Sequence, residues 1–193
     1  MKTHTNIKLL TVLFFSFLIF TSLSCKKNKQ NILPEATQEG KNTFGCKVDG
    51  EIFVGQSRKS DNFLTPDCEG ARSSITILKD DSNNNYFFVK VVGSNCKDKS
   101  MSVGVNLSLE KIQVGKYDLN FKSIGARKEH SGDFLNEEIP TSFITNMQYN
   151  GSCELKKIDT ITNIISGTFS FKAFNGEDSV NVTDGRFDIK IKN

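Results

Sequence analysis

The sequence contains no tryptophan, only three prolines and only two histidines among its 193 residues. A Ser-His-Asp or Cys-His catalytic arrangement needs an imidazole, and His130 is the one histidine beyond the apolar N-terminal segment. The chain also lacks a G-x-S-x-G nucleophile motif and a C-x-x-C pair. We therefore expect His130 to be a solvated loop residue. We expect no catalytic, cofactor-binding or metal-binding residues, and a protein that is not an enzyme.

A strong charge of one sign is also missing. The formal net charge is +3, and Lys2 and Lys8 contribute to it from within the first 24 residues. The following 169 residues hold 23 basic and 22 acidic side chains. Because nucleic-acid binding depends on a basic surface, this nearly neutral remainder argues against a nucleic-acid partner.

Acidic residues occur in adjacent pairs rather than at a spacing typical of hydrolases. Glu137-Glu138 and Asp80-Asp81 are neighbours, and neighbours on a strand point to opposite faces. Glycoside hydrolysis needs two carboxyl groups about 5–10 Å apart in one cleft. The segment 80–85 (DDSNNN) lacks the glycine and final glutamate of an EF-hand calcium loop, so we expect a polar turn there. A hydrolase built from dispersed carboxylates stays the less favoured alternative.

The N-terminus carries a targeting signal. Lys2 and Lys8 make the first residues of the chain positively charged. An uncharged run of 12 residues, 9–20, follows them. A helix of that length spans about 18 Å, which is too short for a hydrocarbon core of about 30 Å. Such a run is typical of a signal peptide, and residues 21–24 (TSLS) fit a cleavage site. We therefore assign residues 1–24 to a signal peptide.

Cys25 follows directly, and the segment S-L-S-C (22–25) resembles the lipobox of bacterial lipoproteins. The resemblance implies that the thiol of Cys25 carries a diacylglyceryl group, that its amine carries a further acyl chain such as palmitate, and that Cys25 begins the mature protein. Two anchoring signals already suffice for stable membrane attachment. Ser22 stands where the family usually has leucine, and ordinary secretion or an uncleaved anchor are the alternatives. Surface-exported lipoproteins tend to carry acidic residues after this cysteine. Because KKNKQ follows here, we expect an outer-membrane lipoprotein on the periplasmic face.

The rest of the chain divides into a tether and one β domain. Residues 25–42 are polar without an apolar period, so we expect a lipidated, flexible tether. From residue 43 onward, apolar and polar residues alternate with period two, and no long window has a helical period. We expect an all-β fold over residues 43–193: a single antiparallel domain of about ten strands. A β-sandwich and a closed or partly open barrel are both compatible with this pattern.

The expected strands cover 43–48, 51–55, 72–79, 86–93, 101–109, 117–121, 142–149, 153–159, 165–174, 179–183 and 186–191. Asp49-Gly50 and Asp184-Gly185 predict tight turns between strands. Residues 122–141 predict a long surface loop. The aromatic stripe of Phe169 and Phe171 is expected to belong to the core rather than to a ligand-stacking face.

Three blocks of this domain resemble a family of Bacteroidota lipoproteins that is classed as a domain of unknown function. The blocks are TFGCKVDGEIFV near its start, NIISGTFSFKAFN, and DSVNVTDGRFDIKI at its end. The resemblance implies an exported all-β lipoprotein, and it implies no activity because none is assigned to the family.

Four further cysteines lie in the domain, and an even number in an exported chain predicts disulfides. Cys68 and Cys96 stand nearly opposite each other across the hairpin centred near residues 82–83, so we predict a Cys68–Cys96 bond. That choice leaves Cys46 to pair with Cys153. The cysteines lack the spacing of a zinc site.

Two tripeptides, Asp159-Thr160-Ile161 and Asp178-Ser179-Val180, resemble the acceptor sequence for O-glycosylation in Bacteroidota, which marks Thr160 and Ser179 as possible sites. The expected function is that of a lipid-anchored, non-enzymatic binding module. Its ligand would be a carbohydrate, a small molecule or another envelope protein. A structural or adhesion component of the envelope is the alternative.

Overall fold

The computed structural model describes residues 32–60, 67–96, 101–121, 123–124, 127–128, 130–136, 138 and 141–191. The predicted signal peptide and Cys25 therefore lie outside the described residues. The described part of the chain consists of strands, turns and irregular segments, without a helix. Accordingly, it contains no helix long and apolar enough to cross a membrane.

Eleven of the strands in the described part form one antiparallel sheet, and two short ones pair separately. The bounds are β1 Thr43–Val48, β2 Glu51–Val54, β3 Ala71–Lys79, β4 Asn85–Asn95, β5 Met101–Leu109, β6 Gly115–Leu119, β7 Ser123–Ile124, β8 Arg127–Lys128, β9 Ser131–Asn136, β10 Phe143–Ile144, β11 Gly151–Asp159, β12 Ile164–Phe174 and β13 Ser179–Lys190. The predicted all-β class and the strand number of about ten are confirmed.

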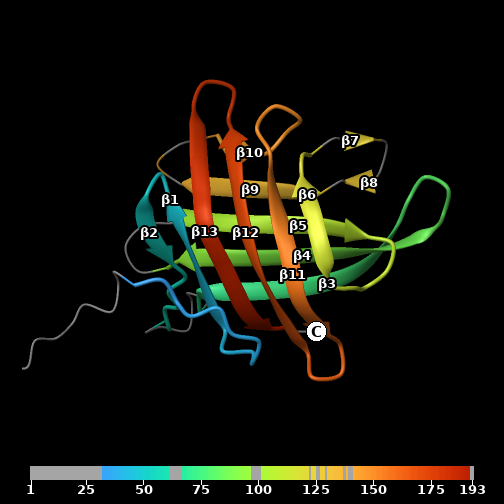
Figure 1. Cartoon of the computed structure of the whole chain (residues 1–193), viewed down its shortest axis with the longest axis horizontal. Coiled ribbons are helices and arrows are strands. Elements are labelled where there is room, and N and C mark those ends of the chain that lie inside the picture. The colour runs from blue at the N-terminus through green and yellow to red at the C-terminus, as the bar shows by residue number, and fades with distance from the viewer. Residues whose placement is uncertain are drawn as a thin grey trace, which may run out of the picture. The chain divides into compact units, whose positions relative to one another are not determined.

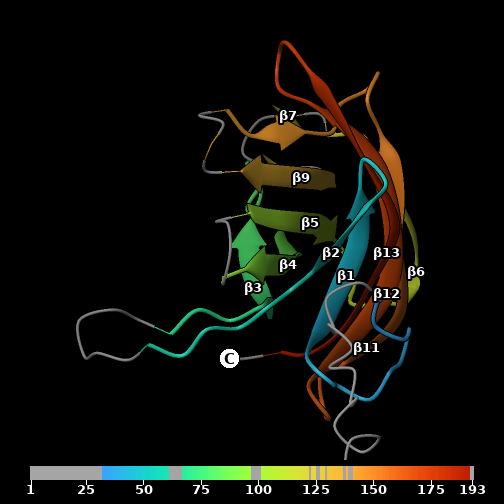
Figure 2. The same ribbon diagram turned by 90° about the vertical axis from the view of Figure 1, so that its left-hand side faces the viewer.

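The sheet curls into a half-barrel of two layers. The front layer has the order β2-β1-β13-β12-β11-β6, and the back layer has the order β10-β9-β5-β4-β3. Figure 1 shows the front strands running across the back strands, and Figure 2 shows the two layers from the side. The layers join where the end of β12 pairs with β10, with Phe174 opposite Ile144.

A second junction between the layers lies in the connection that follows β2. The Gln56 N–H donates to the Ser94 carbonyl of β4 at 2.9 Å, and the Cys96 N–H donates to the Gln56 carbonyl at 3.0 Å. Gly55 still bonds to Phe44 of β1. The chain therefore passes from the front layer to the back layer through continuous backbone pairing.

Inward-facing side chains from both layers pack into one hydrophobic core. Phe44 is fully buried, and its ring lies 5.3 Å from that of Phe169, which in turn lies 6.1 Å from that of Phe171. The prediction that this aromatic stripe belongs to the core is confirmed. Other members of the core are Phe53, Val89, Val91, Val103, Val105, Leu107, Leu119, Phe134, Leu155, Ile165, Val180, Val182, Phe187 and Ile189.

The predicted loop at 122–141 is wrong for much of its length, because the short paired strands β7 and β8 lie there and β9 follows them. This strand pairs with β5 on one side and with β10 on the other, and Phe134 is buried. Its inward position Gly132 faces the ring of Phe171, which would lie 2.5 Å from an added Cβ. Because this inward position is a glycine rather than an apolar residue, the alternation of apolar and polar residues that indicates a strand is not visible in the sequence of β9.

The predicted tight turn at Asp184-Gly185 is also wrong, because β13 runs through these residues as one strand. Phe169 pairs with Gly185, whereas Phe171 pairs with Val182, so β13 carries one extra residue between these pairs. Asp184 has a positive φ of 53°, which places the backbone in the left-handed region that bulges and turns share. The sequence pattern alone does not distinguish these two uses.

One expected strand is much shortened, and another is displaced. The expected strand 142–149 is reduced to Phe143–Ile144, because the Asn146 side chain accepts hydrogen bonds from the backbone N–H groups of Gln148 and Tyr149 and forms a turn. The expected strand 117–121 lies two residues earlier, at Gly115–Leu119.

The compact unit begins at Ile32 rather than at Thr43. Leu33 and Pro34 lie over Gly45 of β1, where an added Cβ would meet Pro34 at 2.4 Å. Residues 32–42, assigned to the flexible tether above, are therefore part of the folded unit.

Candidate functional site

The four cysteines of the domain divide into one bonded pair and two free thiols. Cys68 and Cys96 form a disulfide with a Cα–Cα distance of 5.9 Å, as predicted from the hairpin. The bond joins the connection before β3 to the residue after β4, beside the Arg58–Cys68 bridge. It therefore ties this connection to the end of β4.

The predicted Cys46–Cys153 bond is wrong, because both thiols are free and buried. Cys46 lies on β1 and Cys153 on β11, and β13 and β12 separate these strands. Three strand spacings amount to about 14 Å, whereas a disulfide needs Cα atoms within about 7 Å. Burial raises the pKa of each thiol to about 12, so both stay protonated at neutral pH.

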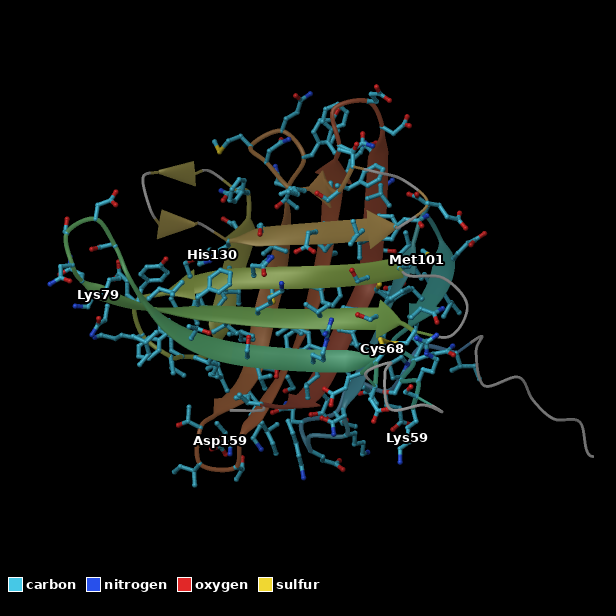
Figure 3. The ribbon with its side chains drawn as sticks, turned by 180° about the vertical axis from the view of Figure 1, so that it is seen from behind. Lys59, Cys68, Lys79, Met101, His130 and Asp159 are labelled. Atoms are coloured by element: carbon cyan, nitrogen blue, oxygen red, sulfur yellow. A yellow bond between two sulfur atoms is a disulfide. The ribbon has the colours of Figure 1, made fainter. Side chains whose placement is uncertain are left out.

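His130 is half-buried rather than solvated. Its Nδ1 accepts a hydrogen bond from the Ser108 N–H at 3.0 Å, and its ring meets Tyr117 edge-on at 5.3 Å. Figure 3 shows His130 at the start of β9. Because Nδ1 is an acceptor, the ring proton lies on Nε2. This histidine therefore supports the junction between β5 and β9.

The described members of the acidic pairs lie in turns. Asp80 accepts hydrogen bonds from the N–H groups of Ser82 and Asn84, which is the polar turn predicted for residues 80–85. Glu137 lies outside the described residues, and Glu138 is exposed. Among the described side chains, no three of the His, Cys, Asp and Glu types form a group that could hold a metal ion.

Asp188 of β13 anchors the N-terminal segment to the outer face of the front layer. Its carboxylate is buried and accepts hydrogen bonds from the Thr37 hydroxyl at 2.5 Å and from the Glu39, Gly40 and Lys41 N–H groups at 3.0, 2.7 and 3.2 Å. Burial raises the pKa of Asp188, but these hydrogen bonds outweigh it and hold the pKa below its usual value. The sequence offered one signal for this role, an acidic residue inside the apolar run FDIKI.

A polar groove of about 630 Å³ lies along the front layer. Four strands contribute to it, namely β6, β11, β12 and β13. Its lining comprises Lys116, Ser152, Glu154, Thr168, Phe169, Ser170, Thr183, Asp184, Gly185 and Arg186. We call this surface the front groove. It is an open groove on the surface rather than an enclosed cavity.

The front groove is electrically balanced. Two cations, Lys116 and Arg186, face two carboxylates, Glu154 and Asp184, and the remaining polar side chains are hydroxyls. Lys47 of β1 forms an ion pair with Asp184 at 2.9 Å and thereby lowers the pKa of that carboxyl. Hydrogen-bond donors and acceptors of both kinds are thus available in the lining, and Lys47 neutralises part of the Asp184 charge from outside it.

The bulge in β13 shapes one wall of the front groove. The ring of Phe169 occupies the space that a side chain at Gly185 would need, since an added Cβ would lie 2.6 Å from it. The Arg186 guanidinium donates to the Asp184 carbonyl at 3.2 Å. The sequence analysis placed Glu154, Thr168, Ser170, Thr183 and Arg186 on strands. It did not identify the groove, because alternation does not reveal which strands are neighbours.

The two possible glycosylation sites are both exposed, one in a turn and the other at the start of a strand. Thr160 follows Asp159, labelled in Figure 3, in the turn between β11 and β12. The Asp159 carboxylate accepts hydrogen bonds from the Ile161 and Thr162 N–H groups. Ser179 is the first residue of β13.

The fold and groove define an all-β domain with an open polar surface site. Residues 97–189 match the model of a protein family described as a domain of unknown function, DUF6252. A DUF6252 domain is therefore present, and it spans β5 to β13 almost completely, with every residue of the front groove inside it. No curated protein matches the chain, and no solved structure matches it.

Proposed function

We propose that this chain is an exported lipoprotein whose β domain binds a neutral carbohydrate in the front groove. The signal peptide 1–24, the S-L-S-C segment and the resemblance to Bacteroidota lipoproteins support export and acylation at Cys25. The Cys68–Cys96 disulfide adds support, because such bonds persist in oxidising compartments. The proposed location is the periplasmic face of the outer membrane, and the proposed role is non-enzymatic.

The hydrogen bonds between Asp188 and residues 37–41, which we call the Asp188 clamp, hold the N-terminal segment on the domain. They therefore limit the length of free chain between the domain and such an anchor. The folded unit begins at Ile32, so seven Cα–Cα steps separate it from Cys25. This stretch covers about 25 Å at full extension. A lipidated chain would therefore hold the domain close to the headgroups, within reach of glycans in the same layer of the envelope.

The balanced lining of the front groove is the observation that carries the carbohydrate proposal. A ligand of strong charge would favour an excess of the opposite charge in its site, and the groove has two cations and two carboxylates. Sugar hydroxyls both donate and accept hydrogen bonds, as do the serine and threonine hydroxyls of the groove. The core between the layers is filled with side chains in the described part of the domain, which favours a surface site over a barrel interior.

Isothermal titration of the purified protein with a glucose hexamer and an N-acetylglucosamine hexamer tests this proposal. Thr168→Val and Glu154→Gln each remove groove hydrogen bonds with little change in shape, so we expect about a threefold to tenfold loss of affinity. Thr76→Val on β3 and Glu177→Gln in the turn before β13 are matched controls outside the groove, and they should leave the affinity unchanged.

Three outcomes would count against the proposal. Absence of heat with both sugars would favour the structural or adhesion alternative. Equal weakening by groove and control variants would place the site elsewhere. Release of shorter sugars during the titration would show a hydrolase.

A further inference from the structure

A second polar site lies at the free edge of β3, on residues that the front groove does not use. β3 ends the strand order of the back layer, and among the described residues it pairs with β4 alone. Figure 3 shows β3 as the lowest strand of this layer, with Lys79 at one end and Cys68 beyond the other. Alternate backbone N–H and C=O groups along such an edge are available to a ligand.

A hollow of about 320 Å³ lies at the Cys68 end of this edge. Residues from β3 and β4 line it together with the end of β13, which approaches from the front layer. The lining comprises Glu69, Ala71, Arg72, Ser73, Ser74, Lys90, Val92 and Lys190. We call this hollow the edge site.

The edge site has an excess of positive charge. Arg72, Lys90 and Lys190 face one carboxylate, that of Glu69. The ion pairs found among the described residues use other cations, Lys41 and Lys47. The Arg72 guanidinium makes one long hydrogen bond, at 3.5 Å, to the Ser94 hydroxyl. Most of its fixed fork of donors therefore remains available for an oxyanion.

We propose that the edge site binds a phosphoryl group. Three cations against one carboxylate leave a surplus that matches the charge of a phosphate monoester, about −1.5 to −2 at neutral pH. Arg72 binds two phosphoryl oxygens, and Lys190 closes the site from the front layer. A free phosphate ester and a phospholipid headgroup share this chemistry.

Titration of the purified protein with inorganic phosphate, followed by NMR, tests the proposal. We choose variants at Arg72 and Lys190, because Lys90 also acts on the carboxylate of Asp133. Arg72→Gln and Lys190→Gln should each weaken phosphate binding about tenfold, as expected for the loss of a charge-assisted hydrogen bond.

Lys79→Gln is the matched control, since Lys79 lies at the other end of the same strand and bonds to Asn83 at 2.8 Å. It should leave the phosphate affinity unchanged. Sedimentation with phosphatidylglycerol vesicles and with phosphatidylcholine vesicles then separates the two sources. Binding to the anionic vesicles that Arg72→Gln abolishes assigns the site to a headgroup, and phosphate binding without vesicle binding assigns it to a soluble ester. Absence of phosphate binding up to millimolar concentrations, or equal binding by Arg72→Gln and Lys79→Gln, would overturn the proposal.

Discussion

The hydroxyl of Thr37 donates a hydrogen bond to the carboxylate of Asp188 across a sequence separation of 151 residues. This bond joins the segment that enters the domain to the last strand. Three backbone N–H groups of the same segment complete the shell around the carboxylate. One buried side chain, that of Asp188, therefore fixes where the N-terminal segment joins the front layer. An anchor upstream of this segment would be connected to the domain at this point.

Replacing Asp188 tests this clamp. Asp188→Asn removes the charge and leaves the amide to face several N–H donors with one acceptor oxygen, so we expect a loss of about 2 kcal/mol in the free energy of unfolding. Urea denaturation measures the change. Asp184→Asn is the control, because Asp184 lies exposed on the same strand with Lys47, and its replacement should leave stability nearly unchanged. Equal stability of the wild-type and Asp188→Asn proteins would show that the shell does not hold the segment.

The same carboxylate should make stability depend on pH. The hydrogen bonds hold the pKa of Asp188 below the value of about 3.9 that it has in the unfolded chain. A group with a lowered folded pKa contributes stability above its unfolded pKa, and this contribution is lost as pH falls through the folded pKa. The stability difference between wild type and Asp188→Asn should therefore be constant from pH 6 to 7 and shrink below about pH 4. A difference that does not change with pH would contradict this account.

The cysteines give a prediction about redox state. Non-reducing peptide mapping should find Cys68 joined to Cys96, and Cys46 and Cys153 as free thiols that react with a thiol reagent only after unfolding, since both are buried. Reduction of the bond should lower the free energy of unfolding by about 3–4 kcal/mol in the chain-entropy model, given its separation of 28 residues. A Cys46–Cys153 bond in the native protein would contradict the strand order of the front layer.

Acylation at Cys25 is a prediction that intact mass can check. Protein extracted from the membranes of its native host should lack residues 1–24 and carry the mass of a diacylglyceryl group and an acyl chain. A Cys25→Ser variant should lose both the added mass and the membrane association. Further hexose increments would support modification of Thr160 or Ser179, and their absence from native material would end that idea. An unprocessed chain that begins at Met1 would contradict the lipoprotein assignment.

The alternation of apolar and polar residues was sufficient to predict most strands. In β5 every inward position carries an apolar side chain, and in β12 every inward position except Gly167 does so. It failed for β9, where Gly132 makes room for Phe171 and hides the pattern. It failed again at Asp184, where a positive φ serves a bulge rather than a turn. In both cases the deciding partner lies on another strand.

Pairing between distant strands limited the prediction of the site as well. Cys68 and Cys96 flank one hairpin, so their bond follows from local register. Cys46 and Cys153 belong to strands whose separation depends on the whole sheet order. The front groove has the same origin, since Glu154 and Arg186 come together only after β12 takes its place between β11 and β13.

The proposed carbohydrate-binding function is tested most directly by locating where a carbohydrate binds. Residue-resolved NMR of the isotopically labelled protein, titrated with the two neutral hexasaccharides, makes that measurement. We predict that the largest shifts fall on Ser152, Glu154, Thr168 and Arg186 of the front groove, while β3 and β4 in the back layer stay unperturbed. Shifts that are absent, or that concentrate away from these strands, would contradict the proposed function.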